Sequence, residues 1–289
     1  MFESVEAFYR PASVREAVQL LQSGKGSARI VAGCTDLIVE DDRSIRSLID
    51  ITHTGLNYIR RRSTRWAIGA TTTMAQIEES AELRNVAGGI LARAAASCGS
   101  VQIRNMATVG GNMANGSPAA DLATPLLALD SAASVASPQG RHRVDLANYL
   151  AEARSRKMAQ SLLAEVTFAE PPGGLRCGWS FQKFGRTAVD ISIVNVAAGL
   201  QLDAHRHVKW ARIALGAVAP TPVRMHEAEA ILTGRTLDHA LVVEACACVM
   251  RHVRPISDQR ASADFRCELS RVLTERALEE CAAAAGCEL

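Results

Sequence analysis

The sequence lacks the short-range signatures of common metal and redox sites. None of its eight cysteines forms a Cys-x-x-Cys pair, so neither a zinc site nor an iron–sulfur cluster is indicated in this chain. Its seven histidines show no metal-ligand spacing either. Because the cysteines are widely spread, we expect buried free thiols in a reducing compartment rather than disulfides.

Excess charge and long apolar runs are also missing. The 32 basic and 30 acidic residues leave a net charge of +2, which gives no indication of nucleic acid as a partner. The N-terminus has acidic residues and no apolar signal-peptide segment, and no stretch reaches the length of a membrane span. We therefore expect a cytoplasmic protein. Its 289 residues, 48% of them apolar, allow two domains with their own cores.

The motifs of several common enzyme classes are absent. No Gly-x-Gly-x-x-Gly opens a helix after a strand, which argues against a nicotinamide-type Rossmann site. No Gly-x-Ser-x-Gly elbow or other nucleophile–base arrangement is visible. The chain therefore has the character of a cofactor carrier without acid–base machinery.

Two glycine-bearing segments carry the strongest signal that is present. Residues 30–37 read IVAGCTDL, and residues 104–112 read RNMATVGGN. Each follows a short apolar run with small residues and then hydroxyl or amide side chains, a composition that lets main-chain N–H groups approach phosphate oxygens. Because there are two such segments, we expect a ligand with two phosphates, which indicates a dinucleotide.

Two charged residues have a functional and a structural interpretation. Asp121 follows the second segment, where its carboxylate suits ribose hydroxyls, but it is also well placed as a helix N-cap. Lys183 lies in a strand-like run on the same face as Phe181, where a solvated strand lysine is the alternative to a ligand contact.

The local patterns predict an α+β chain with a domain boundary near residue 172. Ser13 and Glu16 predict the start of the first helix, which Gly24 ends. The strongest linker signal is EPPGG at 170–174. Strands are predicted at 28–31, 47–51, 66–70 and 161–168 before it, and three strand-like runs followed by three helices, near 225–233, 238–252 and 263–285, after it.

These residues together resemble the FAD-binding medium subunit of molybdenum hydroxylases, the family of xanthine dehydrogenase and aerobic carbon monoxide dehydrogenase. The first FAD segment of that family reads A-G-G-T-D-L, which residues 32–37 match with one change. The second reads I-R-N-x-A-T-I/V-G-G-N-x-x-x-x-S-P-x-x-D, which residues 103–121 match fully. Residues 181–192, 216–224 and 255–260 match further family motifs, so the likeness covers nearly the whole chain.

The resemblance implies a fold and a cofactor. Residues 1–172 would form a two-part FAD-binding domain of the vanillyl-alcohol-oxidase (PCMH) type, and residues 177–289 a small α+β domain with a three-stranded antiparallel sheet and helices. FAD would bind with its pyrophosphate between the two segments, Asp121 on the adenosine side, and Leu162 and Lys183 nearby. The residues thus expected at the cofactor are Val31, Ala32, Gly33, Cys34, Thr35, Asp36, Leu37, Thr108, Val109, Gly110, Gly111, Asn112, Asp121, Leu162 and Lys183.

The resemblance also implies an electron-transfer role in a larger assembly. A small 2Fe–2S subunit would pass electrons to FAD, and a large molybdopterin subunit would hydroxylate the substrate, in a dimer of heterotrimers. Molybdopterin and iron–sulfur clusters are expected on these partners only. The substrate and the final acceptor, whether NAD, oxygen or a quinone, are not defined by this chain. The alternatives are a stand-alone FAD oxidase or dehydrogenase of the same fold, and a flavin-free scaffold subunit.

Cys34 departs from the family pattern because it stands where the second glycine usually lies. If this position needs a positive φ, its Cβ costs on the order of 1–2 kcal/mol. With Gly33, Thr35 and Asp36 intact, we expect the segment to hold FAD nevertheless. An oxidisable thiol beside the flavin is a further hypothesis.

Overall fold

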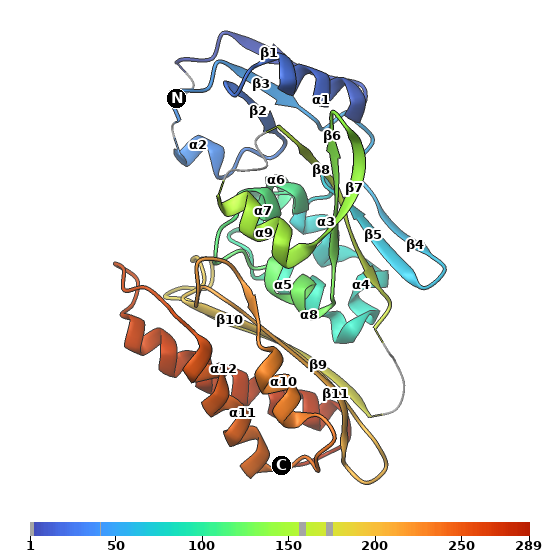
Figure 1. Ribbon diagram of the computed structural model, residues 1–289, viewed down its shortest axis with the longest axis vertical. Helices are drawn as coiled ribbons and strands as arrows, with labels where there is room; N and C mark the ends of the chain where they lie inside the picture. The colour runs from blue at the N-terminus through green and yellow to red at the C-terminus, as the bar shows by residue number, and fades with distance from the viewer. Residues whose placement is uncertain (1–2, 41, 156–159, 172–175) are drawn as a thin grey trace. The chain divides into compact units, whose positions relative to one another are not determined.

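The contacts of the chain divide it into two units in the computed structural model (Figure 1), which describes residues 3–40, 42–155, 160–171 and 176–289. The first unit comprises Met1–Ile77, Ser100–Ser117 and Asp130–Ala169. The second comprises Glu78–Gly99, Pro118–Leu129 and Glu170–Leu289. The chain mixes helices and strands throughout, which confirms the α+β class. The linker expected at 170–174 lies largely outside the described residues, and the domain limits 1–172 and 177–289 stay predictions.

The first unit opens with a three-stranded parallel sheet in the order β1-β3-β2. Its strands are β1 (Ala7–Tyr9), β2 (Ala28–Val31) and β3 (Ser47–Asp50). Helix α1 (Val14–Ser23) begins after Ser13, whose side chain accepts a hydrogen bond from the Glu16 N–H as predicted, and it ends at Gly24. The Glu16 carboxylate accepts from the Ala12 N–H rather than from the N–H of Ser13, so the reciprocal bond of the capping box falls one residue earlier.

A five-stranded antiparallel sheet completes the first unit. Its strands, in the order β4-β5-β8-β6-β7, are β4 (Ile59–Arg62), β5 (Arg65–Gly69), β8 (Leu162–Ala169), β6 (Ala132–Ser137) and β7 (Gly140–Asp145). Residues of α1 and of both sheets share one apolar core, so the small sheet is fixed to the larger one. Of these strands, β5 and β8 were predicted. The strands β4 and β7 were not, because they are rich in exposed arginine and carry no apolar alternation.

The second glycine segment is mostly helical and belongs to a set of short helices in the first unit. They are α2 (Leu37–Glu40), α3 (Met74–Glu79), α6 (Val101–Met106), α7 (Val109–Ala114) and α9 (Leu146–Arg154). Residues 104–106 belong to α6 and residues 109–112 to α7, and only Ala107 and Thr108 between them are extended.

The second unit is built on an antiparallel sheet in the order β12-β11-β10-β9. The strands are β9 (Cys177–Phe184), β10 (Val194–Leu202), β11 (Val208–Gly216) and β12 (Val223–Arg224), so a two-residue edge strand extends the three strands expected. Helices α10 (His226–Leu232), α11 (His239–His252) and α12 (Ala263–Ala284) pack together and against this sheet (Figure 1). Every residue of β10 except Gln201 is buried, which indicates cover on both faces.

Shorter helices of the second unit supply that further cover. They are α4 (Ala81–Asn85), the 3-10 helix η1 (Ala87–Gly89), α5 (Ile90–Ala96) and α8 (Ala123–Ala128). Helix α8 contacts both β10 and β11, and α5 contacts β9. No helix in the described part of the chain is long and apolar enough to cross a bilayer.

A buried arginine joins the C-terminal family motif to the sheet. Arg266 of α12 is 3% exposed, and its Nη1 donates to the Ile193 carbonyl at 2.6 Å. Its Nη2 donates to Asp258 Oδ1 at 2.9 Å, and the other oxygen of Asp258 accepts from Arg260. Residues 255–260 therefore act structurally, because they fix the chain just before β10.

Candidate functional site

The first glycine segment follows β2 and has a run of main-chain N–H groups without hydrogen-bond partners in the described chain. The N–H groups of Gly33, Cys34, Thr35 and Asp36 have no hydrogen-bond partner among the residues that the structure describes. Cys34 adopts a φ of 58°, in the left-handed region. Successive N–H groups around a left-handed residue form a concave nest that binds anions. The segment is thus suited to a phosphate through its backbone alone.

The two predicted segments meet at Gly33. A Cβ on this residue would collide with the main chain of Met106 and Ala107, so only glycine fits there. Asp36 is also hydrogen-bonded to the side chain of Asn115, at the end of α7. Residues that lie about 70 positions apart therefore line one region of the first unit.

The second segment differs from the expected amide cradle because its N–H groups are already used. Thr108 caps α7: its Oγ1 accepts from the Gly111 N–H at 3.1 Å, and its carbonyl accepts from the Asn112 N–H at 2.9 Å. The Val109 and Gly110 N–H groups donate to the carbonyls of Thr72 and Ala70. This segment therefore offers a ligand little main-chain donation.

What the second segment offers instead is space. Gly111 is exposed, its φ is not positive, and a Cβ on it would meet only Thr108 Oγ1, at 3.3 Å. Nearby, Asn112 Oδ1 and Thr71 Oγ1 are buried with no hydrogen-bond partner in the described chain. Buried unpaired polar atoms are rare in folded proteins and mark places where a further group is expected. Together with the free N–H groups at 33–36, these features fit a polar, anionic ligand.

The thiol of Cys34 is poorly suited to redox chemistry. Burial raises its pKa, the charge of Asp50 raises it further, and a weak contact with the Ala32 carbonyl opposes both. The side chain therefore stays protonated at neutral pH, where a thiol is a weak nucleophile. The hypothesis of a reactive thiol gains no support from this environment.

In the second unit, Asp121 and Lys183 form a buried ion pair. Lys183 Nζ donates to Asp121 Oδ2 at 2.8 Å and to the Ser97 carbonyl at 2.7 Å. The side chain of Lys183 is 10% exposed and that of Asp121 is 8% exposed. The alternative of a solvated strand lysine is therefore wrong. The N-cap alternative for Asp121 is also wrong, since α8 begins after Leu122 without a side-chain cap.

Donors from β10 and the residues just before it complete the surroundings of Asp121. Its Oδ1 accepts from Ser192 Oγ at 2.5 Å and from Asn195 Nδ2 at 3.3 Å. Burial raises the pKa of Asp121, while Lys183, Ser192 and Asn195 all act in the opposite direction. Ser192 and Asn195 were missed as site residues because polar side chains in a strand-like run give no signal of a shared partner.

The apolar members of the predicted set contribute packing. Leu162 is 1% exposed in the core that α1 shares with both sheets, and Val31 packs with Ile45 and Leu48. Val109 and Gly110 are buried at the start of α7. Whether each of these residues contacts a ligand stays a prediction.

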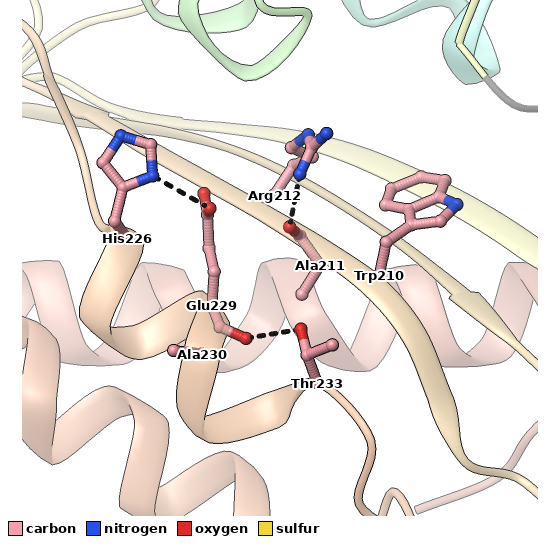
Figure 2. A pocket seen from close by; sticks show the side chains of 7 residues that line it. All are labelled: Trp210, Ala211, Arg212, His226, Glu229, Ala230 and Thr233. Carbon is pink, nitrogen blue, oxygen red and sulfur yellow. Dashed lines mark hydrogen bonds and ion pairs between the residues drawn. The ribbon is translucent and has the colours of Figure 1, made fainter.

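Two other features of the second unit are less suited to a ligand. A hollow of about 470 Å³ (Figure 2) is lined by Trp210, Ala211, Arg212, His226, Glu229, Ala230 and Thr233. The Glu229 carboxylate in it is already engaged by Arg224 and His226. On the surface, His239, Glu275 and Glu279 bring three ligand atoms within 4.8 Å of one another. The sequence contains no signal of this group, because His239 of α11 lies far along the chain from the Glu275–Glu279 pair of α12.

Comparison with known proteins gives matches over both halves of the chain. Residues 2–168 match the family described as FAD binding domain in molybdopterin dehydrogenase, and residues 179–281 match the CO dehydrogenase flavoprotein C-terminal domain. The chain is 32% identical over 293 residues to a xanthine dehydrogenase FAD-binding subunit of Escherichia coli, with 98% of each chain covered. The resemblance seen in the motifs is thereby confirmed.

Two further likenesses extend over nearly the full length. The carbon monoxide dehydrogenase medium chain of Afipia carboxidovorans is 31% identical over 283 residues, which cover 96% of this chain and 97% of that one. A chain in the structure of reconstituted CO dehydrogenase from Oligotropha carboxidovorans has a TM-score of 0.90 at 29% identity, covering 99% of this chain and 100% of that one.

Replacing Cys34 with glycine tests the strain in the first segment. Glycine adopts positive φ without a Cβ clash, so we expect Cys34→Gly to raise the free energy of unfolding, by about 1 kcal/mol at most after the entropy of the more flexible unfolded chain is counted. Urea denaturation measures the change. Ser63→Gly is the matched control, because Ser63 has a φ of 54° in the β4–β5 turn. A destabilised Cys34→Gly beside a stabilised Ser63→Gly would contradict this account.

Proposed function

The chain belongs to the family of FAD-binding domains of molybdopterin dehydrogenases, and we propose that it is the electron-transferring FAD subunit of a heteromeric molybdenum hydroxylase. The observation that carries the cofactor site is the nest of four free N–H groups at Gly33, Cys34, Thr35 and Asp36. A diphosphate is the part of FAD whose charge such a nest complements.

The first segment would hold the pyrophosphate through its backbone. Four N–H donors on a short turn reach several phosphate oxygens without any cationic side chain. The side chain of Asp36 is tied to Asn115, which keeps its carboxylate on a protein partner. Cys34 contributes its left-handed backbone rather than its thiol, so the substitution relative to the family pattern is compatible with binding.

The second segment would let the cofactor come close rather than donate to it. The N–H groups of residues 109–112 already donate to Thr108 and to the carbonyls of Ala70 and Thr72, so the start of α7 has a fixed main-chain geometry. Because residue 111 is glycine, no side chain projects from this surface there. We propose that Thr108 and Asn112 lie beside the cofactor here. The expectation that Asp121 and Lys183 contact the cofactor stays a prediction.

The chemistry supplied by bound FAD is the passage of electrons from a 2Fe–2S partner to an external acceptor. The protein binds and orients the cofactor. We propose a large molybdopterin subunit and a small 2Fe–2S subunit as partners, in a dimer of heterotrimers. Support comes from the relatives, which are by name a xanthine dehydrogenase FAD-binding subunit and a carbon monoxide dehydrogenase medium chain.

Purification from the native cell tests the assembly. An affinity tag on this chain is expected to recover flavin, molybdenum and iron at constant ratios through size exclusion. Metal analysis and the absorption spectrum measure all three. A chain that elutes alone with stoichiometric flavin would instead support a stand-alone flavoprotein, and a colourless chain would support a scaffold subunit.

Gly111→Asp tests the site itself. Because a Cβ on Gly111 would meet one atom alone, the terminal Oγ1 of Thr108, and because its φ is not positive, the variant is expected to fold with a small shift of that hydroxyl. A carboxylate about 4 Å from a phosphate costs about 4 kcal/mol at an effective dielectric constant of about 20, so we expect FAD affinity to fall by roughly two to three orders of magnitude. Fluorescence titration with FAD measures the dissociation constant.

Gly111→Ala is the matched control, since it adds a Cβ without charge. It is expected to bind FAD within a few-fold of the unaltered chain. Equal FAD affinity of the two variants would refute the placement of the diphosphate beside Gly111.

A further inference from the structure

Arginines gather on one face of the five-stranded sheet of the first unit. Cross-strand partners point to the same side of a sheet. From β4 to β7 the register of this face runs through Arg60, Ala67, Thr167, Ala132 and Asp145. Side chains two or four residues away along the same strands share the face, which adds Arg62, Arg65, Arg141 and Arg143.

This face reaches solvent between its two groups of arginines. Ala67, Ser134 and Thr167 lie in the middle of the sheet and are half-buried. Helix α1 packs at one end of the face, near Ala136 and Leu162. Arg65 is half-buried, and the arginines of β4 and β7 are exposed. The face therefore presents small side chains with guanidinium groups on both sides of them.

The charge of these arginines is not neutralised within the described chain. None of the arginines at 60, 62, 65, 141 and 143 forms an ion pair with a carboxylate there. Glu165 and Asp145 share the face but already have partners: Glu165 accepts from the Tyr58 hydroxyl at 2.6 Å, and Asp145 caps α9. With a net charge of +2 the chain as a whole is nearly balanced, so this excess of one sign is local.

Protection of the sheet edges explains only part of this pattern. The strands β4 and β7 are the two edges of the sheet, where charged side chains prevent pairing with other chains. Arg65, however, lies on the inner strand β5. Edge protection also works with charge of either sign, which allows the two roles to be separated by experiment.

The spacing and chemistry of the arginines suit a protein surface. Four strand spacings separate β4 from β7, or about 19 Å, which is too wide for one small anion to meet both groups. Guanidinium groups bind carboxylates in a bidentate manner and are weakly hydrated. Arginine is accordingly enriched at protein interfaces and lysine depleted, and every basic side chain named on this face is arginine.

We propose that this arginine face, formed by Arg60, Arg62, Arg65, Arg141 and Arg143, docks an acidic surface of a partner subunit. The inference rests on the proposed function, which supplies the partner subunits. Arg60 is already oriented for such a contact, because its guanidinium carbon lies 4.2 Å from the centre of the Tyr58 ring. The hydrogen bond from Tyr58 to Glu165 in turn fixes that ring.

Charge reversal on either side of the face tests the inference in the native assembly. The variants are Arg62→Glu on β4, Arg143→Glu on β7 and the double variant, each as the tagged chain in the native cell. Arg15→Glu is the matched control, since Arg15 is exposed on α1, outside the sheet, and the change in net charge is the same. Glutamate keeps a charge on each edge strand, so edge protection survives in all variants.

Molybdenum and iron per chain are measured after purification, and mass photometry of the diluted assembly gives its apparent dissociation constant. A thermal melt and the flavin content of each variant verify that the first unit is folded.

We expect each reversal on the arginine face to raise the apparent dissociation constant about tenfold, because attraction to the acidic surface becomes repulsion. The double variant should lose about a hundredfold, since the two sites are far enough apart to act additively. Arg15→Glu should match the unaltered chain. At about 1 M NaCl, where the Debye length falls to about 3 Å, the unaltered assembly should weaken and its advantage over the variants should shrink.

Other outcomes overturn the inference. If the reversed variants retain molybdenum and iron as firmly as the unaltered chain, the arginines serve edge protection alone. If Arg15→Glu weakens the assembly equally, net charge matters and the arginine face does not. If the unaltered chain itself recovers neither metal, the proposed assembly is wrong, and the inference fails with it.

Discussion

The close approach of two main chains at Gly33 is the constraint on which the cofactor site depends. A side chain at this position would strike Met106 and Ala107, and the first segment would then be pushed away from the start of α7. With glycine there, the turn at residues 33–36 lies against the main chain of Met106 and Ala107, which leads into a helix start whose own N–H groups are satisfied. The free N–H donors of the site are therefore concentrated on the first segment, and the second segment supplies a surface of fixed geometry beside them.

Because the first segment contributes main-chain N–H groups, it tolerates a cysteine at position 34. The segment needs a left-handed residue at position 34, and cysteine adopts that conformation at a cost of about 1–2 kcal/mol. Such a cost is small against the burial of two sheets around a shared core in the same unit. Because the nest is made of backbone groups, the identity of this side chain matters less than its φ. The raised pKa of the thiol further limits it to a passive role.

The sequence predicted the elements whose signals are local, together with the family motifs. Ser13 and Gly24 mark α1, and the apolar strands β2, β3, β5 and β8 were recognised from composition. The helical start at Thr108 was not predicted, because a Gly110-Gly111 pair shortly after a threonine is equally typical of a turn, and the capping bond of Thr108 is visible only in three dimensions. The polar network around Asp121 was missed for the same reason, since Ser192 and Asn195 lie more than 70 residues along the chain.

Hydrogen exchange at the two glycine segments tests the central claim most directly, because it reports on individual main-chain N–H groups. The amides of residues 33–36 should exchange fast in the FAD-free chain and become protected when FAD binds. Those of residues 109–112 should be protected in both states, since protein acceptors already hold them. FAD-dependent protection confined to residues 109–112, with none at 33–36, would contradict the account.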